Sequence, residues 1–382
     1  MTMKKAIGVD VRGIHDGFKG GVGEYTHEVL TRMSTGGEYE LRPLISGQRA
    51  KRQSLYPIAG LEPYPLIQPN KILNASLILR KRPFLDQVIA PAVQGMYMPN
   101  LNITSLSPSV PLVVTVHDLS FDIFPEVFST KMRIWHRMIQ PHRLLHRAQG
   151  IIAVSHSTAR DIHDMYQIPK ERIHVIHPGV SEVYFPLGVS VERREQLRAK
   201  YQLPEKFLLY LGVIEPRKNI QSVVKAFEEI AGEVSDTDLV IAGKTGWLAE
   251  QSTRAIRDSP VRARIHPVGF IDPEDKPDLY RLAQVFVYPS YYEGFGFPPI
   301  EAMACGTPTI TSHTSSLPEV VEEAAWKVSP YDSGELAWAM KEILQNSDLA
   351  SEYRQKGPVQ ARKFQWEANI QRMHRVFRQC FS

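Results

Sequence analysis

Residues 291–303 read Tyr291-Tyr292-Glu293-Gly294-Phe295-Gly296-Phe297-Pro298-Pro299-Ile300-Glu301-Ala302-Met303. The apolar run at 285–288 that precedes this loop predicts a buried strand, and Pro298 or Pro299 suits the first turn of a following helix. Gly294 and Gly296 carry no Cβ, so the main chain can approach a ligand closely there. Strand, glycine loop and helix start therefore follow one another, which predicts an anion site with free amides at the positive end of a helix dipole.

Two carboxylates flank this loop, separated by seven residues. Glu293 lies in the loop and Glu301 in the expected first helical turn, where both could accept hydrogen bonds from hydroxyl groups. The alternative is a tight strand-to-helix turn with two solvated glutamates. An isolated acidic pair of this spacing favours that alternative, so the interpretation depends on other motifs.

A second strand-to-helix junction lies upstream. The apolar run 207–211 ends at Gly212 and is followed by Val213-Ile214-Glu215-Pro216-Arg217-Lys218-Asn219-Ile220. Arg217 supplies a forked donor and Lys218 a point charge where a diphosphate would bind. Alone, an Arg-Lys pair at a helix start indicates a solvated face. Together with the glutamate loop it predicts a site for an anion and a polyol.

With both motifs in this order, the chain resembles the retaining family 4 (group 1) glycosyltransferases of GT-B fold. The resemblance extends over most of the chain, through a glycine-rich loop near the start and through 116–118, 153–155, 268–270 and 364–366. It implies an α/β fold with two doubly wound, Rossmann-like domains that face each other across a cleft. In such sheets ligands bind outside the carboxyl ends of the strands.

The resemblance also implies the site residues. Arg217 and Lys218 would hold the diphosphate and neutralise the departing charge, and Glu293 would bind hydroxyls of the donor sugar. His117 would face that sugar across the cleft, although it could instead only cap a strand end. The predicted catalytic residues are therefore His117, Arg217, Lys218 and Glu293.

The remaining donor-binding residues divide by the part of the nucleotide sugar they would contact. Glu301 would bind the ribose, the amides of 294–297 the sugar and phosphate, and Gly243 with residues 269–271 the base. No metal and no cofactor are expected, because the two cations take the role of a metal and the nucleotide sugar is a substrate. The predicted set is Gly20, Gly21, Gly243, Gly269, Phe270, Ile271, Gly294, Phe295, Gly296, Phe297 and Glu301.

The length of 382 residues exceeds what one hydrophobic core normally supports, so two domains are expected. Continuous apolar runs indicate parallel strands at 5–9, 112–116 and 151–154 in the first half and at 207–211, 238–242, 285–288 and 308–311 in the second. We expect an acceptor-binding domain at 1–185, completed by a C-terminal helix at 366–382, and a donor-binding domain at 200–365. The charged segment after Pro186 would join them.

Charge is uneven along the chain. Residues 1–190 hold 21 Lys+Arg against 15 Asp+Glu, a net +6, and the remainder holds 24 against 26, a net −2. The basic residues concentrate at 79–82 and in 131–138, where apolar residues interleave with them. No nucleic-acid recognition motif accompanies them. The stretch 131–138 therefore predicts either a helix that binds anionic lipid or a packed helix with a wet basic face.

Location and disulfide content follow from the composition. Cys305 and Cys380 are the only cysteines in the sequence. We therefore expect no disulfide framework and a reducing compartment. The start of the chain lacks the pattern of a signal peptide, and no run approaches the ~18 apolar residues of a membrane span. We expect a cytoplasmic protein, associated with the inner face of the membrane.

Several short stretches resemble other ligand-binding motifs, but their sequence context excludes those interpretations. Gly243-Lys244-Thr245 lacks the first glycine of a P-loop, and Thr26 replaces the last glycine of a dinucleotide fingerprint. Asp236 and Asp238 precede their strand, which indicates a surface turn and not a metal-binding pair. His174 and His177 are interpreted as linker residues, because no Cys/His cluster has zinc spacing.

The segments 116–122 and 293–299 look most like bacterial mannosyltransferases of O-antigen and exopolysaccharide assembly. The resemblance therefore favours GDP-mannose as donor and a glycan or lipid-linked acceptor, in cell-surface polysaccharide synthesis. Two alternatives stay open. A nucleotide-sugar 2-epimerase of GT-B fold would convert the donor without an acceptor, and a non-catalytic nucleotide-sugar sensor would bind it without turnover.

Overall fold

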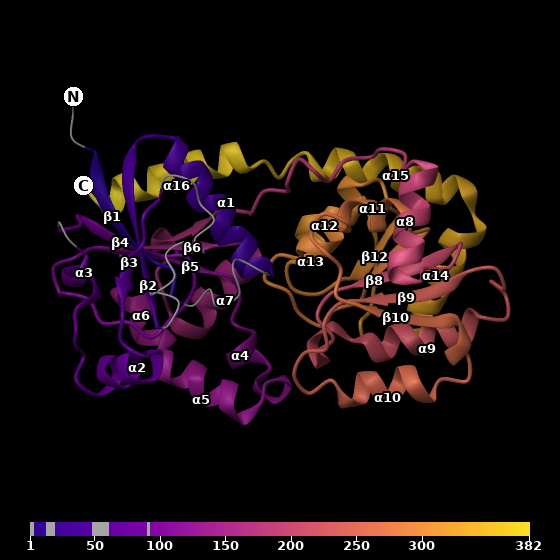
Figure 1. Cartoon of the computed structure of the whole chain (residues 1–382), viewed down its shortest axis with the longest axis horizontal. Helices are drawn as coiled ribbons and strands as arrows, with labels where there is room; N and C mark the ends of the chain where they lie inside the picture. Colours follow the sequence, from indigo (N-terminus) through magenta and orange to yellow (C-terminus); the bar gives the residue numbers. More distant parts are fainter. Residues whose placement is uncertain (1–3, 13–19, 48–60, 90–91) are drawn as a thin grey trace. The chain divides into compact units, whose positions relative to one another are not determined.

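The computed structural model describes residues 4–12, 20–47, 61–89 and 92–382 (Figure 1). The chain divides into two compact units. The first comprises Met1–Leu119, Thr130–Gly179 and Trp366–Ser382, and the second comprises Ser120–Ser129 and Val180–Gln365. Each unit is an α/β layer structure around its own parallel sheet, as the sequence predicted.

Among its described residues the first unit forms a seven-stranded sheet in the order β3-β2-β1-β4-β5-β6-β7. Every neighbouring pair is parallel. The strands are added outward in two directions, from β1 to β3 on one side and from β4 to β7 on the other. The carboxyl ends of β1 and β4, where the two directions diverge, therefore form a topological switch point. The strands are β1 Lys5–Asp10, β2 Tyr39–Ser46, β3 Tyr64–Leu66, β4 Gly95–Met98, β5 Leu112–Val116, β6 Gly150–Ala153 and β7 Ile173–Val175.

Helices α1 and α16 lie side by side on one face of this sheet (Figure 1). The end of α16 can approach the sheet closely because glycines of β4 and β6 face it. A Cβ on Gly95 would lie 2.4 Å from the Phe381 ring, and one on Gly150 would lie 2.8 Å from Cys380 Sγ. The first-unit helices are α1 Gly21–Thr35, α2 Asn70–Leu79, α3 Leu85–Val88, α5 Thr130–Ile139, α6 Pro141–Arg147, α7 His156–Tyr166 and α16 Trp366–Cys380, with the 3-10 turn η4 Lys170–Arg172.

The second unit contains a six-stranded sheet, entirely parallel, in the order β10-β9-β8-β11-β12-β13 across its described residues. Its switch point lies between β8 and β11. The predicted strands at 207–211, 238–242 and 285–288 are confirmed, and the fourth begins one residue later than predicted. The strands are β8 Phe207–Leu211, β9 Asp238–Ala242, β10 Ile265–Gly269, β11 Val285–Tyr288, β12 Thr309–Ser312 and β13 Trp326–Val328.

Helices cover both faces of the second sheet, with α9 and α10 on one side and α11, α12 and α15 on the other (Figure 1). The core between these layers is apolar, and β8 and β11 are buried along their whole length. The helices are α4 Ser120–Ile123, α8 Val191–Tyr201, α9 Ile220–Ile230, α10 Glu250–Asp258, α11 Lys276–Leu282, α12 Phe297–Ala304, α13 Leu317–Val321, α14 Ser333–Gln345 and α15 Ser347–Ala361, with 3-10 turns η3 Pro125–Val127, η5 Pro216–Lys218 and η6 Arg262–Arg264.

The units divide at different residues from those expected. Residues 180–185, expected in the first domain, and 186–199, the expected junction, both belong to the second unit. Leu197 and Tyr201 of α8 enter its core, and Tyr201 donates a 2.6 Å hydrogen bond to Asp275. Residues 120–129 also belong to the second unit, although the sequence assigned them to the first. Neither segment has an apolar run long enough to reveal which sheet it packs against.

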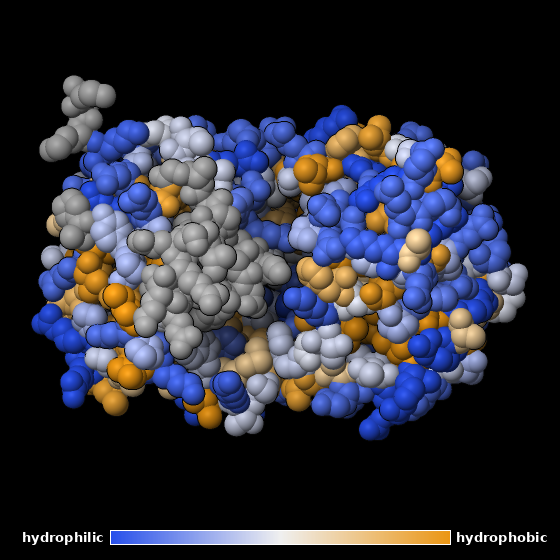
Figure 2. Space-filling model, in the orientation of Figure 1, coloured by the Kyte–Doolittle hydropathy of each residue, from blue (hydrophilic) through white to orange (hydrophobic). Residues whose placement is uncertain are grey.

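Both units have a mixed surface. Hydrophilic residues dominate the face seen in Figure 2, and hydrophobic residues are scattered among them. The exposed apolar side chains include Ile134 of α5 and Trp338 of α14, 54% and 52% exposed. In the parts of the chain that the structure describes, no helix has the length and apolarity to cross a membrane.

Candidate active site

The switch point of the second sheet brings the two sequence motifs together. β8 and β11 are hydrogen-bonded neighbours, so the segments that follow them leave the sheet at the same edge. The N–H of Tyr291 donates to the carbonyl of Arg217 at 3.0 Å. Residues more than 70 positions apart therefore form one local structure, the turn η5 packed against the glycine loop.

Three of the four predicted catalytic residues form a buried ion cluster at this edge. Lys218 Nζ lies 2.5 Å from Glu293 Oε1, and Arg217 Nη1 lies 3.2 Å from Glu293 Oε2. Tyr288 and Ser290 complete it: the Tyr288 hydroxyl lies 2.7 Å from Lys218 Nζ, and the Ser290 hydroxyl donates to Glu293 Oε1 at 2.7 Å. Both cations are thus held in defined positions by groups of the protein itself.

Arg217 has a second carboxylate partner that the sequence reasoning missed. Its Nη2 lies 3.0 Å from Glu215 Oε1, and its Nη1 also donates to the Tyr292 carbonyl at 2.7 Å. Glu215 is 2% exposed. Its place two residues before Arg217, ahead of a proline that starts a tight turn, is the signal that could have identified it.

Burial and charge have opposite effects on Glu293. Burial alone raises the pKa of this carboxyl, but Lys218 and then Arg217 outweigh it and lower the pKa to about 2. Burial and then Arg217 lower the pKa of Lys218, and the ionised Glu293 opposes that shift. The cluster therefore holds charges of both signs where charge would develop on a reacting group, in a site with little water to screen them.

Glu301 lies outside this cluster. Tyr280 donates to Glu301 Oε2 at 2.9 Å, and Lys276 Nζ lies 3.5 Å from the same oxygen. The expectation that Glu301 stands in the first helical turn is wrong. Gly296, with φ 101°, caps the helix and Phe297 is its first residue, so Glu301 is fifth. Tyr280 and Lys276 come from α11 and could not be found from the loop sequence.

The glycine loop is fixed by two serines from the segment before α13. The N–H of Glu293 donates to Ser315 Oγ at 2.8 Å, and Ser316 Oγ lies 2.9 Å from the carbonyl oxygens of both Glu293 and Phe295. Gly294 and Phe295 are buried. A Cβ on Gly296 would lie 2.6 Å from Leu317 Cδ2, so the loop is tightly packed on its inner side.

The predicted base-binding residues gather at the carboxyl ends of β8, β9 and β10. Gly243 donates its N–H to the Gly269 carbonyl at 2.7 Å, and any side chain on Gly243 would collide with the Gly212 carbonyl, 1.8 Å from its Cβ position. Ile271 is buried, whereas Phe270 is 42% exposed. Lys244 Nζ lies 4.5 Å from the centroid of the Phe270 ring.

The remaining predicted residues belong to the first unit. Gly20 caps α1 with φ 85°, and Gly21 is the first residue of that helix. His117 follows β5, and its Nε2 lies 2.8 Å from the Pro99 carbonyl. Burial lowers the pKa of His117, so the neutral ring donates from Nε2 and carries its lone pair on Nδ1.

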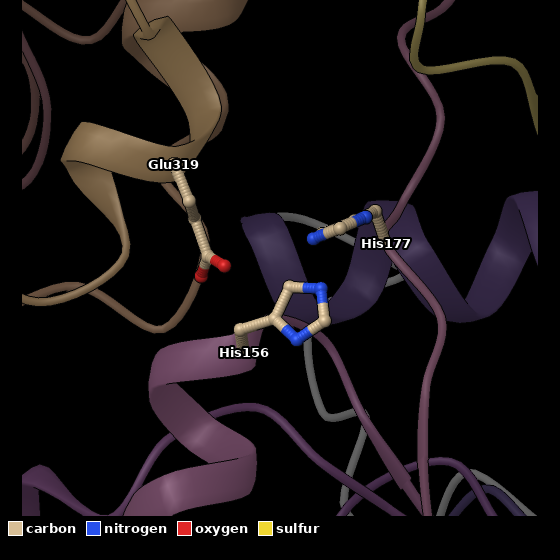
Figure 3. Close-up of side chains that lie close together, drawn as sticks. All are labelled: His156, His177 and Glu319. Carbon is tan, nitrogen blue, oxygen red and sulfur yellow. The ribbon is translucent and has the colours of Figure 1, made fainter.

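Two histidines of the first unit lie close together in Figure 3. His156 starts α7 and His177 follows β7, with ring centroids 5.6 Å apart. Glu319, also drawn there, belongs to the second unit, and we assign no metal site to the three. His174, interpreted as a linker residue, instead lies in β7, and burial lowers its pKa.

The acidic pair weighed as a metal site is bound to cations instead. Asp236 Oδ2 lies 2.5 Å from Lys206 Nζ. Asp238 is the first residue of β9, and its two oxygens lie 3.1 Å from Arg264 and 2.8 Å from His266. These contacts tie the ends of neighbouring strands together.

Solved structures with a similar architecture include glycosyltransferases of GT-B fold. Sucrose-phosphate synthase from Thermosynechococcus elongatus matches with a TM-score of 0.74 and 21% identity, over 99% of each chain. The Anabaena protein Alr3699/HepE in complex with UDP and glucose matches with a TM-score of 0.73 and 17% identity, over 99% of this chain and 100% of its own. At these identities the likeness shows the fold.

Sequence comparison adds the family. The model of "Glycosyl transferases group 1" matches residues 193–360, and that of "Glycosyltransferase Family 4" matches 20–183. The O-antigen chain mannosyltransferase B of Escherichia coli is 33% identical over 257 residues, 67% of each chain. The serotype-specific mannosyltransferase WbdA of Escherichia coli is 34% identical over 58% of this chain, which spans only 27% of WbdA. The chain belongs to the group 1, family 4 glycosyltransferases.

Proposed function

We propose that this enzyme transfers mannose from GDP-mannose, with retention of configuration, to a glycan or lipid-linked acceptor in cell-surface polysaccharide synthesis. The observation that carries the proposal is the buried cluster of Arg217, Lys218 and Glu293 at the switch point between β8 and β11. That is where open parallel sheets bind their ligands. Nucleotide-sugar transfer is the chemistry of the family to which the chain belongs.

In this proposal the cations stabilise the leaving diphosphate. Arg217 and Lys218 bind its oxygens and balance the charge that grows as the sugar departs, so no metal ion is needed for that task. Glu293 and Glu215 orient the two cations beforehand, which reduces the rearrangement required in the transition state. Glu293 also accepts hydrogen bonds from the sugar hydroxyls.

The other donor contacts follow the same assignment. Glu301 binds the ribose, the amides of 294–297 line the sugar and phosphate, and Gly243 with residues 269–271 holds the base. Gly20, Gly21 and His117, all of the first unit, keep the donor-binding roles predicted from the family resemblance. The Pro99 carbonyl orients the His117 ring. Retention proceeds by front-face attack, with the leaving phosphate acting as base for the acceptor hydroxyl.

Mannose as the transferred sugar rests on the relatives, which are named mannosyltransferases. The structural neighbour HepE was solved with UDP and glucose, so UDP-glucose is the first alternative donor to test. A 2-epimerase would convert the donor without any acceptor, and a sensor would bind the donor without releasing diphosphate. Acceptor-dependent release of the nucleotide distinguishes the transferase from the epimerase and from the sensor.

The test is a panel of GDP-mannose, UDP-glucose and UDP-N-acetylglucosamine, each with and without a mannoside acceptor, in which nucleotide release is followed. We expect release from GDP-mannose that rises with the acceptor and persists in EDTA. Release from GDP-mannose that is independent of acceptor, or activity abolished by EDTA and restored by Mg²⁺, would contradict the proposed reaction.

We propose that the first unit binds its acceptor at an anionic membrane, on the cytoplasmic side. Helix α5 presents Arg133 and Arg137 to solvent together with Ile134, and of its ten residues only Ile139 is buried. The helix is amphipathic: Met132, Trp135 and Met138 are half-buried, whereas Arg133, Ile134 and Arg137 lie exposed and place two cations beside an apolar side chain. Such a helix suits the boundary between headgroups and acyl chains.

A further inference from the structure

Ten residues of the first half of the chain are built into the second unit. Residues Ser120–Ser129, which we call the arm, contain α4 and the turn η3. The chain enters the second unit directly after Leu119, two residues beyond His117, and returns to the first unit at Thr130, where α5 begins. The arm therefore connects His117 and the exposed basic helix to the unit that holds the ion cluster.

One end of the arm is held by Trp247, which lies in the loop between β9 and α10. The indole N–H of Trp247 donates to the Val127 carbonyl at 2.8 Å. The ring of Phe128 stacks on the indole, with centroids 5.8 Å apart and planes 20° apart. Phe128 is buried, so this contact fixes both the backbone and a side chain of the arm.

The middle of the arm packs against the glycine loop. The ring of Phe124 lies 5.7 Å from that of Tyr292, at an angle of 56°. Tyr292 is buried, precedes Glu293 and accepts the hydrogen bond from Arg217 through its carbonyl. The arm thus reaches the ion cluster through one residue, because a displacement of Tyr292 would move a partner of Arg217 and the backbone of Glu293 together.

We propose that the arm positions the Tyr292–Glu293 segment for catalysis, with Phe124 and Trp247 as positioning residues. This inference rests on the proposed function of the ion cluster. Through Phe124 the arm contacts Tyr292, whose carbonyl accepts a hydrogen bond from Arg217. Its loss should therefore impair the step in which charge develops on the diphosphate more than it impairs donor binding.

The experiment compares Phe124→Leu, Phe124→Tyr and Trp247→Phe with Trp338→Phe, an exposed tryptophan of the same unit. With GDP-mannose and a mannoside acceptor, we expect Phe124→Leu to lower kcat at least about tenfold while KM for the donor stays within about threefold. Phe124→Tyr keeps the ring and should restore most of kcat, and Trp247→Phe should fall between. Trp338→Phe should match the wild type.

A second readout does not depend on turnover. Hydrogen exchange of the amides in 292–297 should be faster in Phe124→Leu than in the wild type and unchanged in Trp338→Phe. Unchanged exchange there, or a kcat no lower than that of Trp338→Phe, overturns the role of the arm. If the wild-type protein releases no nucleotide from any donor, the proposed function is wrong. The exchange experiment then still decides whether the arm fixes the glycine loop.

Discussion

At the scale of single residues, the cluster around Glu293 links stability and catalysis. Arg217 and Lys218 share one buried carboxylate, and Arg217 has a second in Glu215. Removing one member leaves a buried charge without its partner, which costs about 3–5 kcal/mol in comparable pairs. Variants of this cluster must therefore be compared at a temperature at which each is fully folded.

The first prediction concerns the charge at the leaving group. Arg217→Ala should lower kcat by about a hundredfold or more, because its contact with the diphosphate strengthens as the bond to the sugar breaks. Arg217→Lys should recover only part of this, since an ammonium cannot bridge Glu215, Tyr292 and a phosphate as a planar fork can. Arg257→Ala, an exposed arginine on α10, is the control. Near-normal kcat in Arg217→Ala would exclude the assignment.

The second prediction is a pH dependence of stability. The pKa of Glu293 is about 2 in the folded protein against an ordinary 4.5, so the unfolded chain binds the proton more readily. The stabilisation is complete above pH 4.5 and disappears as the pH falls towards 2. It amounts to about 3 kcal/mol at roughly 1.4 kcal/mol per pKa unit.

Denaturant unfolding of the wild type and of Glu293→Gln between pH 3 and pH 7 measures this dependence. The difference in unfolding free energy between them should be constant from pH 5 to pH 7 and shrink below pH 4.5. Glu250→Gln, an exposed glutamate on α10, should follow the wild type throughout. A difference that does not change with pH would mean that Glu293 is not held ionised by its neighbours.

The third prediction concerns Tyr280. Its buried hydroxyl donates to Glu301 Oε2, and burial raises its pKa well above the usual value, so it remains a donor at every working pH. Tyr280→Phe removes only that hydrogen bond. We expect KM for the donor to rise about tenfold, the equivalent of about 1.4 kcal/mol, with kcat little changed.

Two comparisons make that result specific. Tyr353→Phe, a partly buried tyrosine of α15, should leave KM unaltered, and Glu301→Gln should raise it at least as much as Tyr280→Phe does. If Glu301→Gln raises KM and Tyr280→Phe does not, Glu301 is held by other groups. If neither variant changes KM, the ribose assignment of Glu301 is wrong.

At the scale of elements, α5 carries the fourth prediction. The protein should sediment with anionic vesicles at low salt, and Arg133→Glu with Arg137→Glu should weaken this binding, since each cation contributes about 1 kcal/mol on anionic lipid. Nucleotide release from the donor in solution should not change. Arg254→Glu with Arg257→Glu alters the charge equally on α10 and should bind as the wild type does. Equal binding by both double variants would show that α5 is only a solvated face.

At the scale of the whole molecule, the two ends of the chain meet in the first unit. Helix α16 and the residue Phe381 that follows it bury six apolar side chains there, and Lys5 Nζ donates to the Phe381 carbonyl at 3.0 Å. At about 1.5–3 kcal/mol for each fully buried side chain, α16 contributes as much as the whole stability of an ordinary domain. The buried apolar residues are Trp366, Ile370, Met373, Val376, Phe377 and Phe381.

The fifth prediction follows from that contribution. Deletion of 366–382 should unfold the first unit or lower its melting temperature steeply, leave the transition of the second unit in place, and abolish transfer. Phe377→Ala is a milder test and should cost about 3–5 kcal/mol. Gln379→Ala, on the partly exposed side of α16, is its control. A truncated protein with unchanged melting and activity would contradict the prediction.

Local patterns in the sequence were enough to predict seven strands, among them β5, β8 and β11, and the loops that follow them, but not the interior strands β2 and β4. A strand buried on both faces must be apolar along its length, which made 112–116, 207–211 and 285–288 recognisable. Edge strands are exempt from that requirement: β10 contains Pro267 and β3 contains Pro65, and neither was predicted. The positive φ of Gly296 likewise follows from a local need of the backbone.

Only the tertiary structure decided which of these groups meet. Strand order places β8 beside β11, and this order joins Lys218 to Glu293 across 75 positions. Strand order has no local signature, because any apolar strand can pair with another, and so the partners Tyr288, Ser316 and Tyr280 stayed hidden. The arm was hidden for the same reason. Its ten residues follow a strand of the first sheet in sequence, but their aromatic side chains pack against Trp247 and Tyr292 of the second unit.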